Sequence, residues 1–136
     1  MTQQEIAEFI QTELSKLFPD SGVQVAVRKL IGDPTIVVQY SAGRDRSEWI
    51  NGIIENDRGY SVFLLQVNKD GSTEIDPSRC NIHRVAKLGI EYDKPVEGIG
   101  AKFRKISAKS ELDAAKKLIA WFTKNAEAIR KIPKKF

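Results

Sequence analysis

The sequence predicts a single α+β domain over residues 1–136: an antiparallel sheet of four to five strands with the N-terminal and C-terminal helices packed on one face. Apolar residues recur at helical spacing near both ends of the chain. Between these helical segments lie runs that are rich in β-branched residues and are separated by turn signals. Consecutive strands with short connections pair as antiparallel hairpins, and this predicts the arrangement of the sheet.

The N-terminal segment predicts a helix from Gln3 to Phe18. Thr2 is placed to cap it and Glu5 to complete a capping box. The buried stripe of this helix is expected to comprise Ile6, Phe9, Ile10, Leu14 and Leu17. Proline and glycine in residues 19–22 end the helix.

Two strands at residues 23–28 and 35–41 are predicted to form a hairpin, because the turn signal Gly32-Asp33-Pro34 separates them. Residues 42–46 are then expected to form a loop. Ser47 follows as the N-cap of a short helix that carries Trp49.

The segment 60–67 is apolar on both faces, which is typical of a central strand. The tight-turn sequence at residues 68–71 predicts that residues 72–75 pair back on this strand. Weaker patterns predict one short strand around residues 82–88 and a last strand at residues 99–106.

The C-terminal helix is expected from Ser110 to Ile132, with a short basic tail from residue 133. Its apolar residues fall on one arc of the helical wheel: Leu112, Ala115, Leu118, Ile119, Phe122, Ala126 and Ile129. With both terminal helices on one face, the other face of the sheet is expected to be exposed and is a candidate binding surface.

The composition is that of an ordinary globular domain, with 41% apolar and 29% charged residues among 136. No apolar run is long enough to span a membrane. The first residues lack the pattern of a signal peptide, and Cys80 is the only cysteine. We therefore expect a cytoplasmic protein with no membrane partner.

Positive charge is concentrated at the C-terminal end of the chain. Residues 1–60 contain 6 Lys and Arg against 9 Asp and Glu, whereas residues 99–136 contain 11 against 3. Such asymmetry indicates a nucleic-acid, acidic-membrane or acidic-protein partner, or else a solvated helix and tail that keep the domain soluble.

Several common chemistries are not supported by the sequence. Cys80 and His83 supply only two of the four ligands that a structural zinc needs. No nucleophile elbow, phosphate-binding glycine loop or zinc-protease motif is present. We expect no metal and no cofactor, and the lack of these motifs favours a protein that is not an enzyme.

Arg44 and Arg46 form a charged cluster in the predicted loop beside Trp49. Guanidinium groups bind phosphate or carboxylate through paired donors, so both arginines are candidate binding residues. Asp45 and Glu48 neutralise part of this charge, and a solvated loop with local ion pairs is the favoured interpretation. A small enzyme that uses the two arginines is the least favoured of the functional hypotheses.

The strongest functional signal is a basic surface on the last strand and helix. We define it by Lys102, Arg104, Lys109, Lys116, Lys117 and Lys124. Trp121 is expected at its border, and a positive strip beside an exposed aromatic residue suits a phosphate backbone. The alternative is that Trp121 covers the edge of the core. Asp113 precedes Lys117 by four residues, and Glu127 precedes Lys131 in the same way. Both pairs are expected to neutralise part of the helix.

Residues from about 10 to 55 carry a pattern with a known counterpart. It comprises Leu17-Phe18-Pro19, the strand ending Val27-Arg28, and the stretch from Pro34 through Tyr40 to Gly43 before a helix. This pattern resembles a large polyvalent protein-associated domain of phage and conjugative-element proteins. The resemblance implies a mobile-element protein acting during host entry or against host defence, and it assigns no functional residue.

The leading hypothesis is a non-enzymatic accessory module that binds nucleic acid or an acidic host protein through the basic surface. The alternative is an inhibitor or assembly module that docks through an aromatic patch, either on another protein or as a homodimer. Its expected anchors are Trp49, Tyr60 and Trp121, since aromatic residues dominate binding hot spots.

Overall fold

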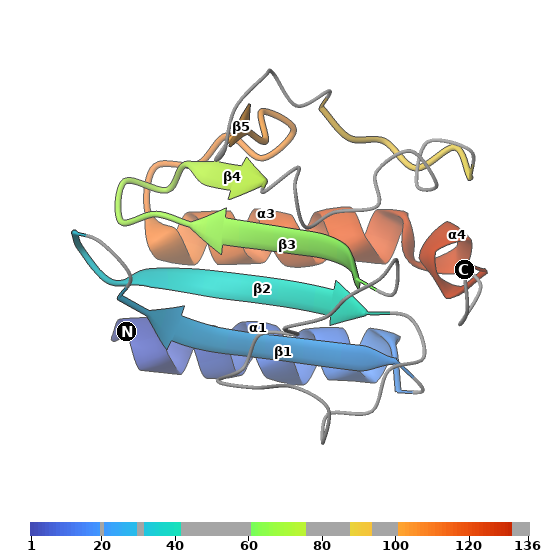
Figure 1. Cartoon of the computed structure of the whole chain (residues 1–136), viewed down its shortest axis with the longest axis horizontal. Coiled ribbons are helices and arrows are strands. Elements are labelled where there is room, and N and C mark those ends of the chain that lie inside the picture. Colours follow the sequence, from blue (N-terminus) through green and yellow to red (C-terminus); the bar gives the residue numbers. More distant parts are fainter. Residues whose placement is uncertain (20, 30–31, 42–60, 76–87, 94–100, 132–136) are drawn as a thin grey trace.

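The computed structural model describes residues 1–19, 21–29, 32–41, 61–75, 88–93 and 101–131 (Figure 1). In chain order the elements are α1 (Gln3–Leu17), β1 (Gly22–Arg28), β2 (Thr35–Ser41), β3 (Ser61–Val67), β4 (Thr73–Ile75), β5 (Ala101–Lys102), α3 (Glu111–Lys124) and α4 (Ala126–Arg130). The predicted α+β class is confirmed.

The five strands form one sheet in the order β1-β2-β3-β4-β5, and every neighbouring pair is antiparallel. One row of the register crosses four strands through Val25, Val38, Leu65 and Ile75. All four of these side chains are buried. The two predicted hairpins are therefore present, and β3 is the central strand, as its apolar sequence predicts.

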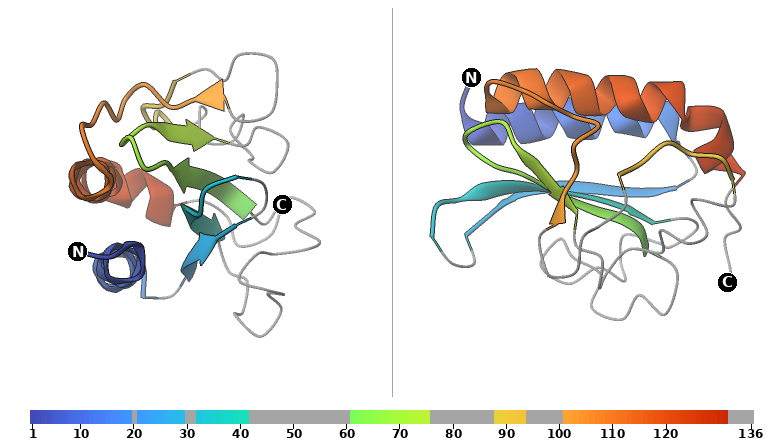
Figure 2. Two further views of the ribbon diagram at one scale, coloured as in Figure 1. Left: turned by 90° about the vertical axis from the view of Figure 1, so that its left-hand side faces the viewer. Right: turned by 90° about the horizontal axis from the view of Figure 1, so that it is seen from above.

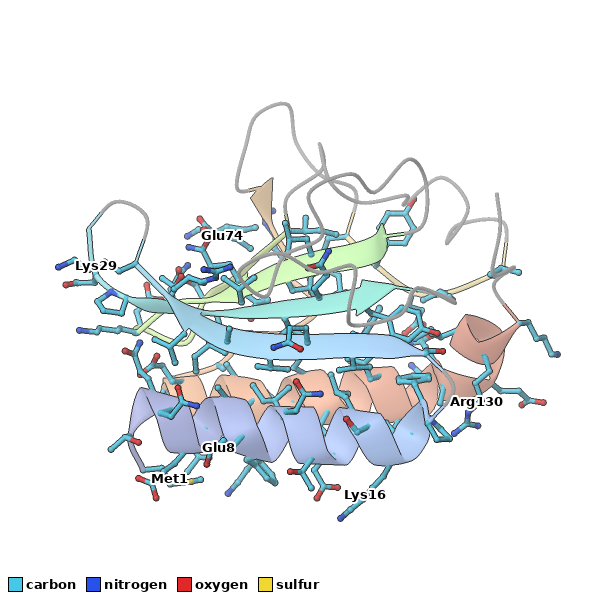
Figure 3. The ribbon with its side chains drawn as sticks, turned by 60° about the horizontal axis from the view of Figure 1, so that its bottom comes forward. Met1, Glu8, Lys16, Lys29, Glu74 and Arg130 are labelled. Atoms are coloured by element: carbon cyan, nitrogen blue, oxygen red, sulfur yellow. The ribbon has the colours of Figure 1, made fainter. Side chains whose placement is uncertain are left out.

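Both long helices lie on one face of the sheet, as Figure 2 shows. The Gln3 amide donates to Glu111 Oε2 at 2.8 Å, which joins the start of α1 to the start of α3. At the other end, Arg130 Nε donates to Leu17 O at 3.0 Å. The two helices therefore run side by side in the same direction. On the side of α1 that faces away from the sheet lie Glu8 and Lys16 (Figure 3).

The main core lies between the helices and the sheet. Phe18 follows the end of α1 and packs edge-on against Tyr40 of β2 and Phe122 of α3, with ring centroids 4.9 and 6.0 Å apart. All three side chains are almost fully buried. Aromatic contacts of this kind stabilise a core beyond the area that they bury, so this cluster joins the two layers.

The start of α1 matches its prediction. Thr2 caps the helix, and the Thr2 and Glu5 side chains each accept the other's backbone N–H in a capping box. This satisfies two of the donors that a helix N-terminus leaves free.

The prediction of one continuous C-terminal helix is wrong, because Asn125 separates α3 from α4. Its backbone has φ −99° and ψ 5°, and its side-chain amide donates to Trp121 O at 3.0 Å. Asparagine side chains compete for backbone groups in this way and favour helix ends. The apolar arc continues across the break, since Ala126 and Ile129 are both buried.

The last strand is also shorter than predicted. Phe103 and Ile106 are both buried although they lie three residues apart. Residues three apart on a strand face opposite sides of a sheet, so burying both on one side requires the chain to turn. A backbone hydrogen bond from Ile106 N to Phe103 O, 3.4 Å long, closes this turn.

The expectation of a bare second sheet face is wrong at the middle of β2 and β3. Val37 and Gln39 alternate along β2 with the core residues Ile36, Val38 and Tyr40, and they are only 8% and 2% exposed. Leu64 of β3, opposite Gln39 in the register, is 8% exposed. The centre of this face is therefore not an open binding surface.

Other predicted features lie outside the described residues. They are the short helix after Ser47, most of the strand expected around residues 82–88, and the basic tail from residue 133.

The edge strand β1 is covered by a side chain of α1. The Gln11 amide donates to Val23 O at 2.9 Å and accepts from Val25 N at 2.8 Å. Gln11 thus bonds two of the outward backbone groups of β1 as a neighbouring strand would, which blunts this part of an edge that otherwise invites pairing with another chain.

We expect Gln11→Ala to lower the free energy of unfolding by about 1–3 kcal/mol, because two backbone groups lose their partners. Urea denaturation measures this change. Gln4→Ala is the matched control, since Gln4 is exposed on the same helix and should change stability by less than about 0.5 kcal/mol. Equal effects of the two substitutions would contradict the edge-covering role.

Candidate nucleic-acid interface

The basic surface defined from the sequence extends over three consecutive parts of the fold. Lys102 is in β5, Arg104 and Lys109 lie in the segment between β5 and α3, and the remaining three are on α3. All six side chains are exposed. The chain thus places its densest positive charge on the last strand, the connection after it and one side of α3.

Two of these six cations are already paired. Lys117 Nζ lies 3.2 Å from Asp113 Oδ2, which confirms the ion pair expected from their spacing. Lys124 Nζ lies 2.7 Å from Glu91 Oε2, a contact that joins positions 33 residues apart. The ion pair expected between Glu127 and Lys131 is not formed, although both residues are described and Lys131 directly follows α4.

The carboxylates of these two pairs are held in their ionised forms. The Lys124 ammonium, by hydrogen bond and charge, lowers the pKa of Glu91, and the Lys105 charge adds to this. The backbone N–H of Lys109 and then the Lys117 side chain lower the pKa of Asp113. Both carboxylates are therefore ionised at neutral pH and offset part of the charge of Lys117 and Lys124.

The other four cations of the basic surface have no partner among the residues that the structure describes. The side chains of Lys102, Arg104, Lys109 and Lys116 form no hydrogen bond and no ion pair with the described part of the chain. They are exposed and need no rearrangement to meet an anion. The usable part of the predicted surface is thus its N-terminal half, from β5 to the second turn of α3.

Trp121 is a core residue, so the expectation of an exposed aromatic side chain at the border is wrong. It is 7% exposed, and its indole N–H donates to Glu91 O at 2.7 Å. Its ring packs edge-on against Phe103 and Phe122, with centroids 5.3 and 5.0 Å away. The segment around Glu91, which the sequence left without a clear element, supplies the indole's partner.

The burial of Trp121 also bears on the aromatic docking patch. A buried ring is not available as an anchor, so one of the three expected anchors is lost. Trp49 and Tyr60 lie in residues 42–60, outside the described residues, as do the candidate residues Arg44 and Arg46. Cys80 and His83 fall in another such range, and the described residues contain no group of three or more metal-ligating side chains.

A depression with a mixed polar and apolar lining adjoins these cations and has no counterpart in the sequence prediction. It lies between the β3–β4 turn and the segment after β5, with a volume of about 420 Å³. Its lining includes Asp70, Ser72, Thr73, Lys102, Arg104 and Ser107. The sequence signals for it are the glycine turn at residues 68–71 and the basic residues after Gly100, but only the pairing of β4 with β5 brings these together.

Comparison with known proteins yields no relative for this chain. No family model, no curated protein and no solved structure matches it. The resemblance over residues 10–55 therefore stays a prediction. No helix among the described residues combines the length and the apolar character that a membrane crossing requires.

Proposed function

We propose that this protein is a non-enzymatic binding module that engages nucleic acid through the unpaired cations of its basic surface. The single observation that carries the proposal is the run of four exposed cations at Lys102, Arg104, Lys109 and Lys116, none of which is paired with another described residue. A phosphate backbone is the polyanion for which such a run is suited, because each neutralised phosphate releases condensed counterions. We also propose an accessory role in a mobile element, which is supported only by the sequence resemblance over residues 10–55.

The burial of Trp121 favours contact with the backbone of a duplex. Proteins that bind single strands stack bases on exposed aromatic rings, and this surface lacks the ring expected there. Lysine and arginine contacts to phosphate position a protein without reading sequence. We therefore infer binding that is independent of base sequence.

The test is the salt dependence of binding to a generic DNA duplex, measured by fluorescence anisotropy. Four phosphate contacts predict a slope of about −3 to −4 for the logarithm of the association constant against the logarithm of salt concentration. Lys116→Gln should reduce this slope by about 1, because it removes one contact. Lys16→Gln is the matched control, since Lys16 is exposed on α1 beside Glu13 and away from the basic surface.

Two outcomes would overturn the proposal. The first is no duplex binding at low salt. The second is binding that weakens equally in Lys116→Gln and Lys16→Gln, because this would reflect net charge alone. Retention of an acidic protein from a nuclease-treated lysate, without duplex binding, would assign the surface to a protein partner instead.

A further inference from the structure

Residues 88–93 form a short segment, drawn in yellow in Figure 1, that is fixed against the C-terminal half of α3. Ile90 is 4% exposed and belongs to the core. The main-chain oxygen of Glu91 accepts the indole N–H of Trp121 at 2.7 Å. The carboxylate of Asp93 accepts the backbone N–H of Lys105 at 2.6 Å. The segment contains these two carboxylates and no basic residue, and we call it the acidic strap.

The strap brings a carboxylate to the C-terminal end of the basic surface. Glu91 Oε2 lies 2.7 Å from Lys124 Nζ, and both side chains are more than half exposed. The charge of Lys105 also acts on the Glu91 carboxylate and helps to keep it ionised by lowering its pKa. Lys124 therefore already has an anion at the position where it would meet a phosphate.

The anchors of the strap make this ion pair a stronger competitor than an ordinary surface pair. Exposed pairs between two flexible side chains contribute little, because holding both of them costs conformational entropy. Here the backbone of Glu91 is held by Trp121 and by the burial of Ile90, so its carboxylate stays beside Lys124 at a high effective concentration. A phosphate must displace this carboxylate and then remain next to it, and like charges in contact are unfavourable.

We propose that the acidic strap is an internal competitor of the nucleic acid. Glu91 occupies Lys124 in place of a backbone phosphate and so limits the duplex contact to the N-terminal half of the basic surface. The inference rests on the proposed function and deepens it, because it assigns to Glu91 a negative control of that same surface. Neutralising this one side chain adds Lys124 to the interface without any movement of the fold.

The experiment measures the affinity for a generic DNA duplex over a range of salt concentrations by fluorescence anisotropy. We expect Glu91→Gln to bind about threefold tighter or more at low salt, with a salt slope that is steeper by about 0.9, because one phosphate contact is added. Glu13→Gln is the matched control. It removes the same charge and likewise frees an exposed helical lysine, since Glu13 Oε1 lies 3.2 Å from Lys16 Nζ on α1. Its salt slope should equal that of the wild type.

A second substitution assigns the gain to Lys124. In the wild type, Lys124→Gln should change the salt slope no more than Lys16→Gln does. In the Glu91→Gln background the same substitution should reduce the slope by about 0.9 and restore the wild-type value. The NMR shift of the Trp121 indole N–H should be unchanged in Glu91→Gln, because the main chain accepts this proton. A changed shift would mean that the carboxylate itself anchors the strap, and this would overturn the role of a competitor held by backbone contacts.

The outcomes separate this inference from the proposed function. Equal changes in Glu91→Gln and Glu13→Gln, or a gain that Lys124→Gln does not remove, overturn the competitor and leave the nucleic-acid surface standing. Duplex binding by Glu91→Gln but not by the wild type supports the competitor and overturns the proposed function of the four other cations. No duplex binding by either protein at low salt overturns both.

Discussion

Replacement of Gly71 by alanine should lower the free energy of unfolding by about 3 kcal/mol or more. Two costs add at this position. The φ of +88° is strained for any residue with a Cβ, at about 1–3 kcal/mol. The new methyl group would also lie 2.7 Å from Ser110 N, so the backbone before α3 must shift, at a further cost of about 1–3 kcal/mol. Urea denaturation of the purified variant measures the sum.

The chain provides two matched controls for this prediction. Gly32 and Gly89 have φ of +80° and +73°, and a Cβ at either would meet no atom within 4 Å. Alanine at these positions bears only the conformational cost, about 1–3 kcal/mol. Equal losses at all three glycines would show that Gly71 does not hold the β3–β4 turn against Ser110. In that case the wall of the depression would lose its structural basis.

Replacement of Trp121 by alanine should destabilise the fold by about 3–5 kcal/mol, the range for deleting a large aromatic side chain from a core. The loss includes its packing on Phe103 and Phe122 and the hydrogen bond to Glu91 O. Because this bond ties the segment at Glu91 to α3, amide exchange at residues 88–93 should also accelerate. Thermal or urea unfolding, together with hydrogen exchange, measures both effects.

A second variant keeps this prediction decisive if the alanine variant does not fold. Trp121→Phe preserves most of the packing and loses the indole donor, so we expect a loss of about 1–2 kcal/mol with duplex binding unchanged. Lys124→Ala, an exposed site on the same helix, should alter stability by less than about 0.5 kcal/mol. Wild-type stability with impaired binding in Trp121→Phe would restore Trp121 as a contact residue.

The parts of the fold that the sequence predicts correctly are those that depend on neighbouring residues. The capping box of α1 needs only Thr2 and Glu5, and the β3–β4 hairpin needs only its turn sequence and the runs beside it. The ion pair between Asp113 and Lys117 follows from a spacing of one helical turn. The concentration of positive charge after residue 99 is likewise a property of the sequence itself.

The errors arise where distant segments decide the outcome. Helical periodicity places Trp121 at the edge of the apolar arc, and only its contacts with Phe103 and Glu91 make it a core residue. Periodicity likewise predicts helix through Asn125, whose side chain instead bonds Trp121 O and ends α3. Residues 88–93, which cover this side of α3, have no periodic pattern that predicts their position.

The sequence by itself determined the α+β class, the antiparallel pairing and a positive C-terminal region, because local spacing and composition are sufficient for each. Only the tertiary structure decided which cations are free. Lys124 is paired because Glu91 is folded against α3, whereas Lys102 and Arg104 form no ion pair with the described part of the chain. The net charge of a segment is a sum over its residues and can be read from the sequence. The charge available for binding depends on which side chains are already paired, and contacts between segments far apart in the chain determine this pairing.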